Sequence, residues 1–213
     1  MTEIVVRMIK KVNLDVGRLH NDSTTVKAYG KISGVTKNGL RMAKGNNKDN
    51  RPDLVHLVFS LTISSDGAVP IHYKTYAGNR TDDTTHIETW NTVKKIAKRS
   101  DFIYVADSKV CTSTQLTYIV ANGGRVITVM PNTWGETKIF KEELLSKNIP
   151  RKVILKRNVE GDREYFSLFL TNYKTINDGY TIYWYLSSQK KRLDKTIRQK
   201  RVSRAESALM ELS

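Results

Sequence analysis

Two aspartates, Asp22 and Asp107, lie on or directly after predicted strands that could bring their carboxylates together in a sheet. Asp22 lies within a predicted strand over residues 18–29, and Asp107 follows the apolar run 102–106, which is typical of a buried parallel strand. If these strands are neighbours, about 4.8 Å apart, both carboxylates meet at one edge of a sheet. Close carboxylates repel unless a cation neutralises them, and their hard oxygens favour Mg²⁺ or Mn²⁺. Paired ions of this kind activate a water or a 3′-hydroxyl for phosphodiester transfer.

A simpler interpretation of these residues stays open. Asp22 could cap a turn, and Asp107 could cap the helix that follows it. His20 lies two residues before Asp22 and therefore shares its strand face, either as a supporting group or as an ordinary surface residue.

The elements that would position the two aspartates follow from the hydrophobic pattern. Residues 54–63 alternate in polarity, a turn follows at residues 64–67, and residues 69–76 return, which predicts an antiparallel meander. A helix is predicted after the cap cluster Thr81-Asp82-Asp83, and another over residues 113–121, ending at Asn122-Gly123-Gly124. With a further buried strand at 126–130, we expect an α/β fold with a mixed five-stranded sheet and flanking helices. In a sheet ordered 3-2-1-4-5, the first and fourth strands would be neighbours.

The pattern changes after Pro131. Aromatic-rich segments at 152–157, 164–171 and 180–188 predict a small β-rich insertion, and residues 190–213 predict a basic amphipathic helix. The expected organisation is a lead-in segment 1–14, a core 15–135, an insertion 136–189 and the helix 190–213.

Charge indicates a polyanionic partner. The chain has 36 Lys plus Arg against 21 Asp plus Glu, a formal net charge of +15. A cluster on a predicted helix comprises Lys94, Lys95, Lys98 and Arg99. The densest cluster, which opposes a single acid, Asp194, is the predicted DNA-binding set: Lys190, Lys191, Arg192, Lys195, Arg198, Lys200, Arg201 and Arg204. Two clusters and this net charge favour nucleic acid over a merely solvated basic surface.

Composition excludes several other classes of protein. The apolar runs are far shorter than the ~20 residues of a membrane span, and the single cysteine, Cys111, cannot form an internal disulfide or a cysteine-cluster zinc site. We therefore expect a soluble, intracellular chain without a membrane partner.

Four stretches, in order, carry a resemblance to a known family. They are LHNDSTTV (19–26), KDNRPDLVHLVFSL (48–61), YAGNRTDDTT (76–85) and YVADSKVCT (104–112). The chain resembles the DDE transposases of bacterial insertion sequences, in the branch with a β-rich insertion before the final acid. The match covers about residues 15–135 well and the remainder loosely.

The resemblance implies an RNase H-like fold in which Asp22 and Asp107 are two of three metal-binding acids. It further implies Mg²⁺ or Mn²⁺ as cofactor, double-stranded DNA (transposon ends and target) as partner, and a bacterial cytoplasmic protein that joins the nucleoid when bound to DNA. It is also compatible with a homodimer in the DNA complex. The intact enzyme would cut donor DNA and join the freed 3′-hydroxyl to target DNA.

The third acid of the family is a Glu within a Tyr-x2-Arg-x3-Glu-x6-Lys signature, which this sequence lacks. The residues four positions after Arg198, Arg201 and Arg204 are valine or alanine, and Glu206 and Glu211 lack the surrounding signature. We therefore expect a truncated catalytic core that is inactive alone. The alternatives are a non-catalytic nucleic-acid-binding protein, or an RNase H-like nuclease with another acid near Asp107.

Overall fold

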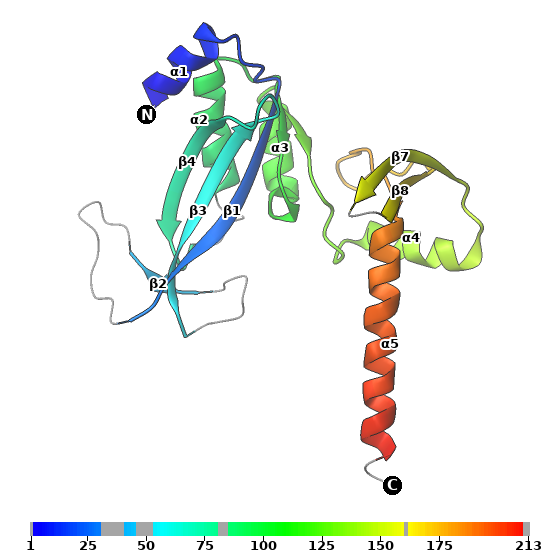
Figure 1. The fold of residues 1–213 in the computed structure, drawn as a ribbon. Helices are drawn as coiled ribbons and strands as arrows, with labels where there is room; N and C mark the ends of the chain where they lie inside the picture. The colour runs from blue at the N-terminus through cyan, green and yellow to red at the C-terminus, as the bar shows by residue number, and fades with distance from the viewer. Residues whose placement is uncertain (1, 31–40, 46–52, 81–84, 160–161, 211–213) are drawn as a thin grey trace. The chain divides into compact units, whose positions relative to one another are not determined.

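The computed structural model describes residues 2–30, 41–45, 53–80, 85–159 and 162–210, which form two compact units, Met1–Pro131 and Asn132–Ser213 (Figure 1). Residues 48–52 of one family-like stretch, and the cap cluster at 81–83, lie outside the described residues. Each unit is described by itself.

The first unit is a mixed sheet with helices. Its elements are α1 (Thr2–Lys11), β1 (Arg18–Ala28), β2 (Ala43–Lys44), β3 (Val55–Ser64), β4 (Pro70–Ala77), α2 (His86–Ala97), β5 (Ile103–Val105), η2 (Ser108–Val110), α3 (Ser113–Ala121) and β6 (Arg125–Ile127). The helix α3 has the bounds expected from the sequence, because Thr112 caps its start and Gly123, at φ 83°, allows the chain to turn at its end.

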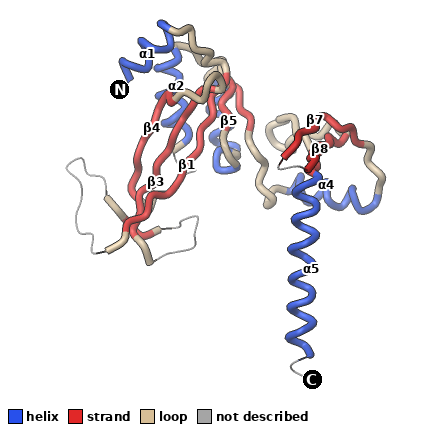
Figure 2. Tube along the Cα trace, in the orientation of Figure 1, coloured by secondary structure: helices blue, strands red, loops and turns tan. Residues whose placement is uncertain are grey.

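The sheet has the expected strand order (Figure 2). Across it run β4, β3, β1, β5 and β6; the β1–β3 and β3–β4 pairs are antiparallel, and the β1–β5 and β5–β6 pairs are parallel. The predicted order 3-2-1-4-5 is confirmed. The short strand β2, a sixth strand that the sequence did not predict, pairs with the part of the β3 edge that β4 leaves unpaired.

One face of this sheet packs against the helices. Its core centres on fully buried Leu19, Trp90, Phe102, Tyr104 and Ile119, drawn from β1, α2, the β5 segment and α3. The buried positions recur every second residue along the strands and every three or four residues along the helices. One face of each element therefore packs inward.

The strand β3 alternates as expected, but its polar face is the buried one. His56, Ser60 and Thr62 are buried, whereas the alternating apolar residues, among them Leu57 and Phe59, are only half-buried. The helices therefore cover the face that carries the hydroxyl and imidazole groups. The opposite face of β3 is apolar and partly exposed. Asp22 of β1 pairs opposite Leu61 of β3, so the two side chains lie on this same face of the sheet.

The second unit contains α4 (Gly135–Ser146), β7 (Arg151–Val159), β8 (Asp162–Phe169), β9 (Tyr185–Ser187) and α5 (Ser188–Met210). The three strands form an antiparallel sheet in chain order. The helix α4 was not predicted, and the last strand is shorter than the predicted 180–188. Among the residues that the structure describes, none of the helices combines the length and the apolar composition needed to cross a membrane.

Aromatic side chains hold α4 against the loops and strands of this unit. The Phe140 ring stacks on Trp184 with 4.1 Å between centroids and meets Phe169 and Tyr173 edge-on at 5.3 and 5.8 Å. Glu136, also on α4, is buried and accepts a hydrogen bond from the backbone N–H of Ile176. These contacts form a small core separate from that of the first unit.

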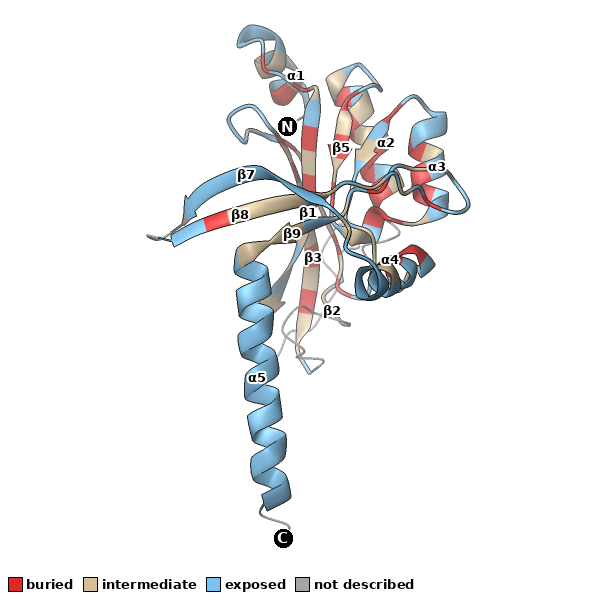
Figure 3. Ribbon diagram, turned by 90° about the vertical axis from the view of Figure 1, so that its right-hand side faces the viewer, coloured by how far each residue is buried: buried red, intermediate tan, exposed pale blue. Residues whose placement is uncertain are grey.

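The helix α5 has no buried residue along its whole described length (Figure 3). The apolar residues predicted to form one face stay exposed, with 54 % of Leu193, 40 % of Ile197 and 68 % of Leu209 accessible. Ile197, Arg201 and Arg204 are spaced i, i+4 and i+7, so charged and apolar side chains share one side of the helix. The helix therefore has no continuous apolar face along this stretch.

Candidate active site and nucleic-acid interface

The pairing of β1 with β5 decides where the two aspartates lie. These strands are parallel neighbours, and their last paired residues are His20 and Val105. Asp22 and Asp107 each follow by two positions, so the register, continued, brings them level on strands about 4.8 Å apart. Because side chains alternate along a strand, both carboxylates take the face of His20 and Val105, opposite the helices. Both residues are exposed.

Local backbone groups orient each carboxylate. The Asp22 Oδ1 atom accepts a hydrogen bond from the N–H of Ser23 at 2.8 Å, and the Asp107 Oδ1 atom accepts one from Lys109 at 3.0 Å. Asp107 thereby caps η2, a short turn that the sequence did not predict, whereas Thr112 caps the predicted helix α3. The carbonyl of Asp107 accepts the hydroxyl of Thr128, directly after β6. Capping and metal binding are compatible, because a carboxylate has about four acceptor positions.

Asn21 anchors the strand immediately before Asp22, a role that the sequence analysis missed. Its amide is buried and its Nδ2 donates to the Ser60 hydroxyl at 2.9 Å, the Leu61 carbonyl at 3.1 Å and the Thr62 hydroxyl at 3.0 Å. Two N–H groups are thus shared among three acceptors on β3. The sequence feature that could have revealed this role is the alternation of polar residues along β3, because hydroxyl groups on a buried strand face need hydrogen-bond partners.

Tyr104 lies beneath the site, on the buried side of β5. It is fully buried, and its hydroxyl lies 3.1 Å from Nδ1 of His86 at the start of α2. Burial raises the pKa of Tyr104, and the nearby Tyr76 and Asp107 raise it further. The phenol therefore stays neutral and ties β5 to α2, which fixes the strand that ends at Asp107. His20, on the other face, contacts Ser65 through Nε2 at 2.8 Å.

The carboxylate oxygens of Asp22, within β1, and of Asp107, just after β5, suit a hard divalent cation. Mg²⁺ is commonly held by one or two carboxylates together with waters and substrate phosphates, and Asp22 with Asp107 would supply the two carboxylates. Within the described ranges, no group of three or more His, Cys, Asp or Glu side chains is placed to hold a metal ion. The structure thus adds no third ligand to these two, and their role as metal ligands stays a prediction.

The eight predicted DNA-binding residues all lie on α5, and each of them is exposed. Two of them have acidic partners: the Nζ atom of Lys190 lies 2.6 Å from Asp194, and an Arg192 nitrogen lies 2.5 Å from Asp162. Lys200, Arg201 and Arg204 follow on the outer half of the helix, spaced i, i+1 and i+4, so they share one side.

The second basic cluster is partly occupied by contacts within the first unit. The Lys94 ammonium lies 5.0 Å from the centroid of the Trp90 ring, and Arg99 makes two hydrogen bonds to the carboxylate of Asp101. Lys98 ends α2 in a left-handed conformation at φ 55°. These residues cap and close α2, which weakens the argument that this cluster binds nucleic acid.

Two solved structures resemble parts of this chain. The piggyBac transposase synaptic complex with hairpin DNA is 15 % identical, with a TM-score of 0.39, over 86 % of this chain and 38 % of that chain. The Mos1 transposase paired-end complex with the left transposon end is 11 % identical, with a TM-score of 0.35, over 69 % of this chain and 53 % of that chain. This chain therefore spans about four-tenths of the length of the piggyBac transposase chain and about half of the Mos1 transposase chain. Neither a protein-family model nor a curated protein matches the sequence. With both TM-scores below 0.5, these likenesses do not assign a family.

Proposed function

We propose that this chain is the first part of an RNase H-like catalytic domain of a DDE transposase, of the type found in bacterial insertion sequences. The observation that supports the proposal is the parallel pairing of β1 with β5 as far as His20 and Val105. If that register continues for two residues, Asp22 comes level with Asp107. The strand order and the exposed basic helix α5 support it further. The protein would act in the bacterial cytoplasm on double-stranded DNA.

In this proposal Asp22 and Asp107 hold Mg²⁺ or Mn²⁺. The ion would polarise the scissile phosphate and lower the pKa of an attacking water or 3′-hydroxyl. The chain itself contributes orientation, since Ser23 and Lys109 fix one oxygen of each carboxylate through backbone N–H groups. Asn21 fixes the strand that carries Asp22 against β3. Cations on α5 would neutralise the phosphates of the DNA backbone.

We further propose that the third acid belongs to a segment with the Tyr-x2-Arg-x3-Glu-x6-Lys signature that this sequence does not contain. Two-metal catalysis needs both reacting oxygens in line, and about 1 Å of misplacement can slow a reaction ~10²-fold. We therefore expect the 213-residue chain to bind DNA without nicking or joining it.

The test of the metal site is Mn²⁺ binding to the whole chain, followed by electron paramagnetic resonance. We expect Asp22→Asn and Asp107→Asn each to weaken Mn²⁺ binding at least tenfold, because each removes one of two ligands. Asp66→Asn, an exposed acid in the turn between β3 and β4, is the matched control and should leave the binding unchanged. Equal Mn²⁺ affinity in all four proteins would refute the site.

Cleavage and strand-transfer assays on labelled oligonucleotides test the catalytic part. Metal-dependent cleavage by the chain alone that disappears in Asp107→Asn would show that an acid within it completes the site, with Glu206 as a candidate. The proposed dependence on an additional segment would then be wrong.

A second candidate is a non-catalytic nucleic-acid-binding protein, favoured by the exposure of the eight α5 cations. It predicts DNA binding that is insensitive to Asp22→Asn, together with no specific Mn²⁺ site. The two candidates therefore differ in the resonance experiment even if neither protein cleaves DNA.

A further inference from the structure

A groove of about 630 Å³ lies in the second unit, between the three-stranded sheet and the first turns of α5. Its residues come from β7, β8, β9 and α5, and only its helix side belongs to the basic segment that the sequence indicates. The groove exists because strand pairing brings separate parts of the chain together.

The floor of the groove is one face of the sheet. Val153 pairs opposite Ser167, and Ser167 pairs opposite Leu186, so one residue from each strand lies in a row. Tyr165 and Arg163 precede Ser167 by two and four positions on β8 and therefore share its face. The floor thus carries apolar surface, an aromatic ring and a guanidinium group.

The wall of the groove is one face of α5. Its groove-lining residues are Ser188, Lys191, Arg192 and Lys195, spaced i, i+3, i+4 and i+7. This spacing puts them on a single side of a helix. Three cations therefore line the groove from the helix.

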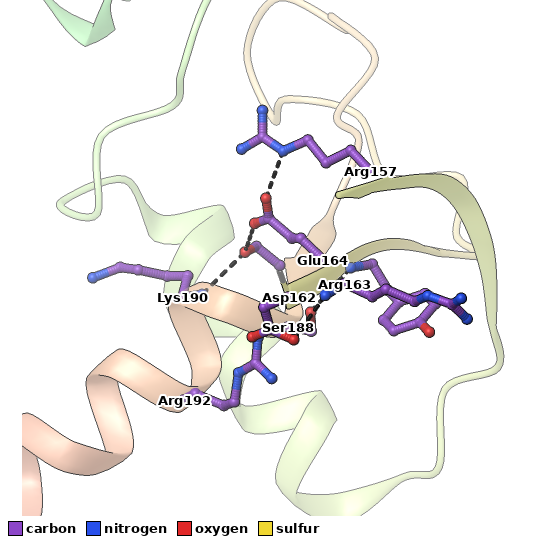
Figure 4. Close-up of polar contacts among 9 residues, drawn as sticks. Arg157, Asp162, Arg163, Glu164, Ser188, Lys190 and Arg192 are labelled. Carbon is purple, nitrogen blue, oxygen red and sulfur yellow. Dashed lines mark hydrogen bonds and ion pairs between the residues drawn. The ribbon is translucent and has the colours of Figure 1, made fainter. Parts of the chain in front are cut away.

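Charge in the groove is strongly positive. Arg151 and Arg163 from the sheet join the three helix cations, and none of the ten described residues that line the groove is acidic. Asp162 at the rim pairs with Arg192, and in Figure 4 the two side chains point toward one another. Four of the five cations are left to attract an anion.

Hydrogen bonds fix the wall against the floor (Figure 4). The Ser187 hydroxyl donates to Oε1 of Glu164 at 2.6 Å and accepts the backbone N–H of Lys190 at 3.0 Å. The Arg157 side chain donates to Oε2 of Glu164 at 2.6 Å, and the Ser188 hydroxyl accepts the backbone N–H of Tyr165 at 3.0 Å. Glu164 faces away from the groove and is buried. The groove is therefore held open in one geometry before any ligand binds.

We infer that this groove binds an unpaired strand of nucleic acid. Grooves for single strands combine cations that follow the phosphates with aromatic rings on which bases stack. Here the half-buried Tyr165 ring, with the Lys156 ammonium 6.0 Å from its centroid, lies among five groove cations. The volume is that of a small-ligand pocket and admits about one or two nucleotides, not a double helix. The inference rests on the proposed DNA-processing function, since such enzymes handle freed strand ends.

The experiment is fluorescence anisotropy of the whole chain with a labelled thymidine oligonucleotide of about eight nucleotides. Tyr165→Leu should lower its affinity about fivefold or more, through lost stacking, whereas Tyr165→Phe should retain it. The double variant Arg151→Gln/Arg163→Gln should lower the log–log salt slope by about 1.4, since each single-strand phosphate contact contributes about 0.7.

The matched control is Lys138→Gln/Lys141→Gln, which removes the same charge from exposed positions of α4, in the same unit but outside the groove. We expect it to leave the single-strand slope unchanged. An equal fall in slope for both double variants, or full affinity in a folded Tyr165→Leu protein, would overturn the inference. Equal competition by a glutamate oligopeptide of the same charge would overturn it too, because the groove would then be a general anion site.

This experiment is separate from the test of the proposed catalytic function. Asp22→Asn should bind the oligonucleotide like the unchanged chain. Full Mn²⁺ affinity in Asp22→Asn would show that the proposed metal site has failed, whereas full strand affinity in the folded Tyr165→Leu protein would show that the groove inference has failed. Either result leaves the other proposal standing.

Discussion

Replacing Lys200, Arg201 and Arg204 together with Gln should reduce the salt dependence of duplex DNA binding. These cations share one side of the outer half of α5 and are exposed, so a duplex can contact all three. Each phosphate neutralised on duplex DNA contributes about 0.9 to the slope of log affinity against log salt, so three contacts contribute about 2.7. Between 50 and 200 mM salt, the unchanged chain should therefore lose about 40-fold more affinity than the variant.

Fluorescence anisotropy with a labelled duplex at several salt concentrations measures both slopes. The control replaces three exposed lysines, Lys138 and Lys141 on α4 and Lys147 at its C-cap, with Gln, which removes the same charge from the same unit. If contact with α5 governs binding, the control keeps its slope. If both variants lose the same slope, net charge alone attracts the DNA and the assignment of the interface to α5 is refuted.

Three further predictions concern the groups that hold each unit together. Asn21→Ala should lower the free energy of unfolding by about 1–3 kcal/mol, because buried hydroxyls on β3 lose their donor; urea denaturation measures it, and an unchanged value would contradict the anchoring role. Gly124→Ala should also destabilise, by about 1–3 kcal/mol, because its Cβ would lie 2.8 Å from the Trp90 ring, whereas Gly135→Ala meets nothing within 4 Å and should be neutral in the same assay. The Ser and Arg partners of Glu164 lower the pKa of its carboxyl, so its stabilisation is complete above the unfolded pKa of about 4.3 and is lost as pH falls through the lower folded pKa. Thermal unfolding of the unchanged chain should therefore depend on pH in that acidic range more steeply than that of Glu164→Gln, and parallel curves would contradict this.

The sequence predicted the central sheet because its strands carry local signals. The alternation over residues 54–63 shows the two-residue period of a strand, the turn after it marks a reversal of the chain, and the short apolar run before Asp107 is typical of a buried strand. The helix α3 was also predicted, since Asn122-Gly123-Gly124 marks its end. The order 3-2-1-4-5 is the one that makes the strands of the two aspartates neighbours, and the resemblance of four sequence stretches to a known family supported it.

Other features could not be predicted because they depend on distant contacts. The strand β2 contains only two residues, too few to show a period, and exists through its pairing with β3. The helix α4 begins at Gly135, a poor helix former, and is held by the stacking of Phe140 on Trp184. Which face of β3 is buried was decided by the helices of its unit and not by its hydropathy.

In the candidate site too, some features could be predicted from local sequence and others depend on distant contacts. The positions of Asp22 and Asp107 on neighbouring strands followed from sequence order, whereas the support from Asn21 required knowing that the hydroxyls of β3 are buried. The groove could not be predicted from the sequence, because Arg151 and Arg163 come near the first turns of α5 only through the pairing of β7, β8 and β9.

The exposure of helix α5 has a consequence for its order along its length, and for the DNA binding proposed for it. Its 23 residues span about 34 Å, and its bonds to the sheet are made near its start, by Ser188 and Arg192. Farther along, its persistence depends on intrinsic helix–coil equilibrium, so amide exchange should quicken steadily toward Met210. A polyanion that binds the ordered form shifts that equilibrium, which links helicity to ionic strength. If α5 binds DNA as proposed, its outer half would enlarge the capture radius for the duplex and would gain order as the encounter proceeds.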